Sequence, residues 1–150
     1  MTERVDFYVL KDATPKQGWT FACRLTEKAY LRNMRVAILT ETDADSVSLD
    51  GLLWTFTDRG FVPHEIYREA GSAASASPVY LTADPDGGPG ADLLVNLSDR
   101  MPKQLQRFAR IAEIIDADAE RKRLGRERFK CYRELQLALE THQLDAATDI

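Results

Sequence analysis

Residues 121–133, RKRLGRERFKCYR, carry the most distinctive chemistry in this sequence. The segment holds seven basic residues and one acid, Glu127, which gives it a net charge of +6. The whole chain of 150 residues has a net charge of −4, so the remaining positions sum to −10. A general basic coat for nucleic acid is therefore excluded, because most of the surface should repel phosphate. One local patch is left that would attract an acidic group.

On a helical wheel the cations of this segment separate from its apolar residues. Leu124, Cys131, Leu135 and Ala138 fall within about 60° of one another and form the expected buried face, flanked by Tyr132 and Leu139. On the opposite side, the expected stripe consists of Lys122, Arg126 and Arg133, with Phe129 and Lys130 beside it. Neighbouring like charges destabilise a helix, which a partner would relieve. A solvated helix face, nucleic-acid phosphates and an acidic peptide with an apolar anchor all remain possible.

Patterns typical of enzymes and cofactor sites are missing. The stretch KDATPKQG at 11–18 lacks the glycines of a phosphate-binding loop, and DPDGGPGAD at 84–92 is interrupted by prolines. Cys23 and Cys131 are both expected in the core, and His64 is interpreted as structural or at the surface. We therefore expect no catalytic, cofactor or metal site and no small-molecule substrate. No apolar run suggests a signal peptide or a membrane span, and sparse cysteines favour the cytoplasm.

Short apolar segments alternate with amphipathic ones along the chain. Strands are predicted at 5–10, 34–40, 78–82 and 92–97, and 61–66 is predicted to be extended. Helices are predicted at 15–32, from Asp43 or Asp45 to Gly60, briefly after Pro102, and from Asp116 or Asp118 to about Leu139. Residues 109–115 fit a strand or a helix, and about 140–150 are expected to fray. The alternation favours a single three-layer α/β/α domain over residues 1–150, with a mainly parallel sheet.

The order of several motifs resembles the chi subunit of bacterial DNA polymerase III. The motifs are DFYVL at 6–10, MRVAIL at 34–39, LDGLLWTF at 49–56, FVPH at 61–64, LLVNL at 93–97 and GRERFKCYR at 125–133. The resemblance implies a Rossmann-like fold without a functional nucleotide loop, and a non-enzymatic protein of the clamp-loader complex. It also implies two partners. One is the psi subunit, in a 1:1 heterodimer, and the other is the C-terminal tail of single-stranded DNA-binding protein, which ends in acidic residues and Pro-Phe with a free carboxylate. DNA would be contacted mainly indirectly.

The resemblance also assigns residues to both surfaces. The tail site would use Lys122, Arg126 and Lys130 against carboxylates, with Phe129 and Ile115 lining a pocket for the terminal phenylalanine. The helical wheel adds Arg133 to this set of residues. The psi surface would centre on Trp54, Phe61 and Pro63, although Trp54 could equally lie in the core. The alternative function is direct binding of single-stranded nucleic acid by the same basic helix.

Overall fold

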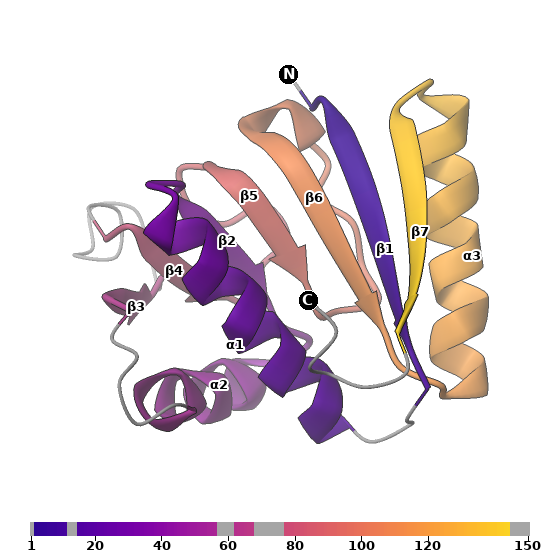
Figure 1. Ribbon diagram of the computed structural model, residues 1–150. Helices are drawn as coiled ribbons and strands as arrows, with labels where there is room; N and C mark the ends of the chain where they lie inside the picture. Colours follow the sequence, from indigo (N-terminus) through magenta and orange to yellow (C-terminus); the bar gives the residue numbers. More distant parts are fainter. Residues whose placement is uncertain (1, 12–14, 57–61, 68–76, 145–150) are drawn as a thin grey trace.

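The fold is a parallel β-sheet between two layers of helices. It is described from a computed structural model, which covers residues 2–11, 15–56, 62–67 and 77–144 (Figure 1). The strands are β1 (Arg4–Leu10), β2 (Val36–Leu39), β3 (His64–Ile66), β4 (Val79–Thr82), β5 (Ala91–Asn96), β6 (Phe108–Ile115) and β7 (Ala138–Leu144). The helices are α1 (Pro15–Leu31), α2 (Asp43–Thr55), α3 (Ala119–Glu134) and the short 3₁₀ helix η2 (Leu105–Arg107).

The strand order is β3-β4-β2-β5-β6-β1-β7, and every described pair is parallel. Apolar side chains from α1 and α2 pack on one face, and Tyr132 of α3 packs on the other. The central strands β2 and β4 are buried at every position, as expected for strands covered on both sides. The prediction of a three-layer, Rossmann-like α/β/α domain is confirmed.

Local sequence signals explain where the helices begin. Thr42 caps α2 through a bond from the Asp45 amide to the Thr42 hydroxyl (3.1 Å), and Asp118 caps α3 through the Arg121 amide (3.0 Å). The ambiguous segment 109–115 lies in β6, because β1 and β5 pair with it on both sides. The helix expected after Pro102 is reduced to η2, and the buried Phe108 begins β6.

The C-terminal prediction is wrong in two respects. The helix ends at Glu134 instead of about Leu139, and residues 140–144 form a strand with 138–139 instead of fraying. Gln136 has a φ of 61°, its amide bonds to the Arg133 carbonyl (2.9 Å), and the Leu137 amide bonds to the Tyr132 carbonyl (3.3 Å). This is a Schellman C-cap with glutamine in the place that glycine usually takes. β7 then pairs with β1 over its full length.

The predicted buried face of α3 is also wrong. Cys131 and Leu135 are exposed and Leu124 is half-buried, whereas Gly125, Arg128 and Tyr132 face the sheet. Cys23, in contrast, is fully buried as predicted. The helical wheel failed because it built the buried face from apolar residues alone and did not include Arg128, which is only 4% exposed.

A buried carboxylate explains why Arg128 lies inside. Glu113 of β6 is fully buried, and one of its oxygens accepts a bond from Arg128 Nε (3.1 Å). The other oxygen accepts bonds from the Tyr132 hydroxyl (2.6 Å) and Asn96 Nδ2 (3.0 Å). Burial and the neighbouring Glu113 raise the pKa of Tyr132 well above its ordinary value, so the phenol stays protonated and donates. This network fixes which side of α3 faces the sheet.

Removing Glu113 alone should therefore destabilise the domain more than removing Glu113 together with Arg128. We expect Glu113→Ala to lower the free energy of unfolding by about 3–5 kcal/mol, because it strands the buried Arg128 charge. The double variant Glu113→Leu/Arg128→Met should lose clearly less, since it removes both charges. Urea denaturation of both variants measures the free energy of unfolding. A smaller loss in the single variant than in the double variant would contradict the account.

Candidate functional site

A groove lies between one flank of α3 and the strands β1 and β7. Its volume is about 260 Å³. The groove is lined by apolar, cationic and polar side chains, namely Phe7, Val9, Ile115, Lys122, Gly125, Arg126, Phe129, Thr141 and Gln143. A shallower hollow adjoins it on α3 and shares Arg126 and Phe129 with it. The two hollows together form the most chemically distinctive surface of the described chain.

The floor of the groove is apolar. The Phe129 ring packs against Phe7 with 5.2 Å between ring centroids, so Phe129 is half-buried and one side of it remains accessible. Gly125 lets α3 approach the sheet closely, because a Cβ at this position would overlap Ile115 Cδ1. A groove of this size with an aromatic wall suits one large apolar side chain.

Cations form the rim of the groove, and the structure divides the basic segment into paired and unpaired residues. Arg121 contacts Asp99 and Asp116 (both 3.3 Å), Arg123 contacts Glu120 (2.6 Å) and Glu127 (3.0 Å), and Arg128 contacts Glu113. The hydrogen bond and charge of Glu120 raise the pKa of Arg123 above its ordinary value. Within residues 121–133, the basic side chains that form no ion pair with a described residue are Lys122, Arg126, Lys130 and Arg133.

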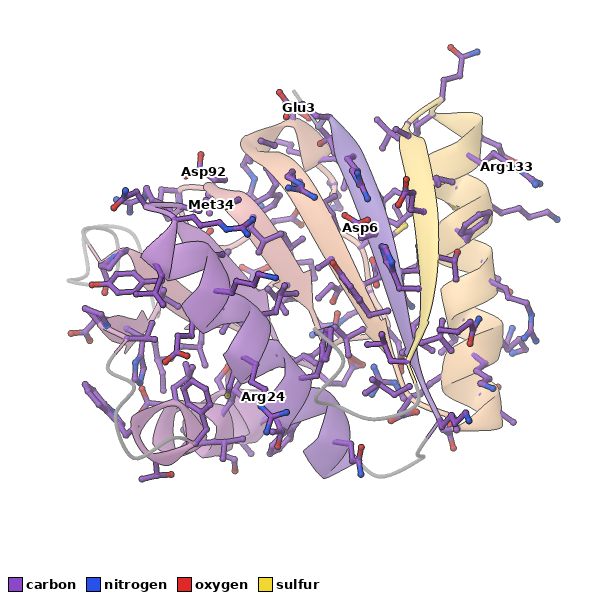
Figure 2. The ribbon with its side chains drawn as sticks, viewed as in Figure 1. Glu3, Asp6, Arg24, Met34, Asp92 and Arg133 are labelled. Carbon is purple, nitrogen blue, oxygen red and sulfur yellow. The ribbon has the colours of Figure 1, made fainter. Side chains whose placement is uncertain are left out.

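These unpaired cations are the ones that the sequence assigned to the site. Lys122, Arg126, Phe129 and Ile115 all line the groove, whereas Lys130 and Arg133 line the adjoining hollow. Figure 2 shows Arg133 extending from α3 away from the sheet. The structure thus brings all six predicted residues into one continuous surface, with five of them on α3 and Ile115 at the end of β6.

Sequence reasoning missed five residues of the groove. Phe7 and Val9 were assigned only to a buried strand, although the alternation in VDFYVL places them on one face. Gly125 inside a helix was a signal for close packing that was not used. Thr141 and Gln143 were missed because the segment containing them was expected to fray.

The second predicted surface lies at the far side of the sheet, where α2 contacts β3. The Trp54 side chain is 48% exposed, so the core interpretation is wrong. Its ring packs on His64 (4.3 Å between centroids), and His64 is buried with Nδ1 2.6 Å from the Val62 carbonyl oxygen. Pro63 is half-buried, and Phe61 lies outside the described residues. His64 therefore has a structural role, and its buried ring supports the Trp54 ring that packs on it.

A third cluster lies on the α1 face of β1 and β7. Asp6, Glu140 and His142 bring three possible metal-ligand atoms within 4.8 Å of one another. However, the Asp6 carboxylate already contacts Arg4 (2.8 Å), His142 (3.0 Å) and Arg110 (3.4 Å), and Arg4 also contacts Glu140 (2.7 Å). Asp6 lies on the side of β1 that faces the viewer in Figure 2. The cluster is an ion-pair network that joins β1, β6 and β7.

The carboxyl ends of β2, β5 and β6, where open α/β sheets usually bind ligands, are filled by arginine side chains. Arg121 donates to the carbonyl oxygens of Leu97 (3.0 Å) and Ile114 (3.4 Å). Arg100 donates to those of Thr40 and Glu41 (both 2.9 Å). Both arginines are therefore held at this end of the sheet by main-chain oxygens.

Fold and site together define a Rossmann-like α/β/α domain with a cation-rimmed apolar groove on the outer flank of one helix. Residues 1–140 match the sequence profile described as DNA polymerase III chi subunit, HolC, and the chain belongs to this family. It is therefore a component of the replication machinery.

Relatives over the full chain agree with this assignment. The DNA polymerase III subunit chi of Pseudomonas aeruginosa is 36% identical over 141 residues, which cover 94% of this chain and 96% of that protein. The Escherichia coli subunit chi is 25% identical over 139 residues, which cover 90% of this chain and 94% of that protein. Among solved structures, T4 UvsW matches with a TM-score of 0.64 and 8% identity over 96% of this chain and 41% of UvsW, a likeness of fold alone. No described helix is both long enough and apolar enough to cross a membrane.

The Asp6 network makes part of the stability depend on pH. Burial raises the pKa of Asp6, but hydrogen bonds from Arg4 and His142 outweigh it, so the pKa lies below its ordinary value of 3.8. A lowered carboxyl pKa contributes stability above the unfolded-state pKa and loses it as pH falls through the folded-state pKa. The stability difference between the natural chain and Asp6→Asn should therefore be largest above about pH 5 and shrink toward pH 2. Urea denaturation across this range tests it, and a constant difference would contradict it.

Proposed function

We propose that this chain is a non-catalytic, cytoplasmic adaptor that binds the acidic C-terminal tail of single-stranded DNA-binding protein in the groove beside α3. The observation that carries the proposal is the set of four cations without a described acidic partner, around a groove with an aromatic wall. Such a site matches a peptide that ends in acidic residues and a phenylalanine, in both charge and shape.

Each part of the groove would have a role in the complex. Lys122 and Arg126 stand at the rim of the apolar floor, where they would receive the terminal carboxylate while the phenyl ring lies on Phe129, Phe7 and Ile115. Lys130 and Arg133 continue along α3 and would receive the upstream acids. Ion pairs that stay exposed, such as those expected for Lys130 and Arg133, contribute at most about 1 kcal/mol each, whereas burying a phenyl ring contributes about 1.5–3 kcal/mol. Micromolar binding requires both kinds of contact, since it amounts to about 8 kcal/mol.

Direct binding of single-stranded nucleic acid is less well supported. Non-specific binders present exposed aromatic rings in a positively charged channel. Here Phe129 is already packed against Phe7, and the chain outside the basic segment is acidic. The tail peptide and DNA are therefore the two ligands to compare.

The first test is a titration with a peptide that carries acidic residues followed by a C-terminal Pro-Phe. We expect a micromolar dissociation constant that rises with salt. Arg126→Ala, and separately amidation of the peptide terminus, should each weaken binding by about tenfold or more, because each removes one partner of a partly desolvated charge pair. Gly125→Ala should also weaken it, since the added methyl pushes Ile115 into the groove.

The matched control is Arg32→Ala, which removes one exposed positive charge on the α1 side of the molecule. It should leave the peptide affinity unchanged within about twofold, because surface charges that far apart are screened. The proposal fails if Arg32→Ala and Arg126→Ala weaken binding equally. It also fails if single-stranded DNA binds with a steep salt dependence while the peptide does not bind at all.

We also propose that the psi subunit binds the surface that includes Trp54, Phe61 and Pro63, and joins the chain to the clamp loader as a 1:1 heterodimer. Trp54 supports this because a half-exposed tryptophan on a rigid helix is typical of an interface anchor. The surface lies beside the edge strand β3, whereas the groove lies beside the opposite edge strand β7 (Figure 1). Both partners can therefore bind at once.

Trp54→Ala should abolish or weaken psi binding by at least about tenfold, as expected for an interface anchor. It should leave tail-peptide affinity unchanged and lower the free energy of unfolding by no more than about 1 kcal/mol, since half of the ring is already in water. Leu31→Ala, at an apolar position on α1 that is 72% exposed, serves as control and should retain psi binding. Titration with purified psi measures both, and equal effects of the two substitutions would contradict the assignment.

A further inference from the structure

Strand β7 is an open edge of the sheet. It stands last in the strand order and pairs with β1 in unbroken register, from Ala138 opposite Arg4 to Leu144 opposite Leu10. No other strand of the described chain pairs with its outer side, and in Figure 1 the helix α3 runs alongside β7 there. Its outer side therefore presents backbone N–H and C=O groups that can pair with an additional strand.

β7 also lacks three of the features that often protect edge strands, namely proline, lysine and a bulge. Its sequence, ALETHQL, contains no proline and no lysine, and its register with β1 shows no bulge. Six of its seven residues are exposed or half-buried, and only Leu144 is buried. An unprotected edge of this length is a suitable acceptor for an extended peptide.

The cation-rimmed groove follows this edge. Thr141 and Gln143 of β7 line one side of the groove, and Lys122 and Arg126 of α3 line the other. Lys130 and Arg133 continue the α3 side past the groove. A chain extended against the outer side of β7 would therefore present every second side chain to this cationic flank.

We propose that β7 accepts the acidic segment of the bound tail as an eighth, parallel strand, so that backbone hydrogen bonds hold the tail together with the cations. This rests on the proposed function, because the peptide is the one assigned to the groove. The orientation follows from the groove: Val9 and Gln143 lie near the carboxyl ends of β1 and β7, so a peptide that ends there runs in the same direction as β7.

The dimensions agree with this arrangement. Along α3, Lys122 and Arg133 are about 16 Å apart at a rise of about 1.5 Å per residue. An extended chain covers that distance in about five residues at about 3.3 Å each. The N–H groups of alternate residues face β7, so the penultimate proline, which has none, fits when it faces solvent. In that register the terminal residue and the third and fifth residues from the end donate to β7.

The experiment is a backbone N-methylation scan of the tail peptide, with affinity measured by titration. A methyl group at the third or the fifth residue from the end should weaken binding about tenfold, because it removes one hydrogen bond to β7. A methyl group at the fourth residue should change affinity less than about twofold, because that amide faces water. This alternation is specific to an added strand.

The remaining outcomes separate the two proposals. If the three methylated peptides bind equally while Arg126→Ala still weakens the unmodified peptide, strand addition is wrong and the tail site stands. If the unmodified peptide does not bind, the proposed function fails and strand addition fails with it. A dimer of the free chain that persists in sedimentation after saturation with peptide would assign the edge to a second copy and overturn the proposal.

Discussion

The buried Glu113 carboxylate is the constraint on which the functional surface depends. It lies on β6 and accepts hydrogen bonds from Arg128 and Tyr132 of α3 and from Asn96 of β5. A buried carboxylate that loses its charge partner and its hydrogen-bond donors is strongly destabilising, so α3 cannot rotate about its axis without a large penalty. With Arg128 and Tyr132 held inward, the flank that carries Lys122, Arg126 and Phe129 must face β7. The contacts on the inner face of α3 thus determine which side chains its flank presents to the groove.

The charges of the basic segment consequently divide by function. Arg121, Arg123 and Arg128 are used within the domain, since each is ion-paired to described acids. The unpaired cations face the groove or its extension, while the rest of the molecule is acidic overall. This charge distribution fits the acidic peptide of the proposed function better than it fits the DNA backbone.

Sequence patterns predicted the fold well wherever local and tertiary preferences agree. The segments 5–10, 78–82 and 92–97 consist mostly of apolar residues, which is typical of strands in a sheet that is covered on both faces. The patterns failed where a distant partner decides the outcome. Arg128 is buried because Glu113 is on the opposing strand, and residues 138–144 become β7 because β1 would otherwise lack a neighbour on that side. Thr141 and Gln143 belong to that strand, which is why the β7 side of the groove was missed while Lys122, Arg126, Phe129 and Ile115 were identified.

Amide chemical-shift mapping tests the central claim most directly. In the ¹⁵N-labelled chain, adding the acidic tail peptide should shift resonances of the groove, namely Phe7, Val9, Ile115, Gly125, Arg126, Phe129, Thr141 and Gln143. Amides near Trp54 and along α1 should stay unchanged, because they lie elsewhere on the molecule. Shifts confined to α1, α2 or β3, with the α3–β7 groove unaffected, would contradict the account.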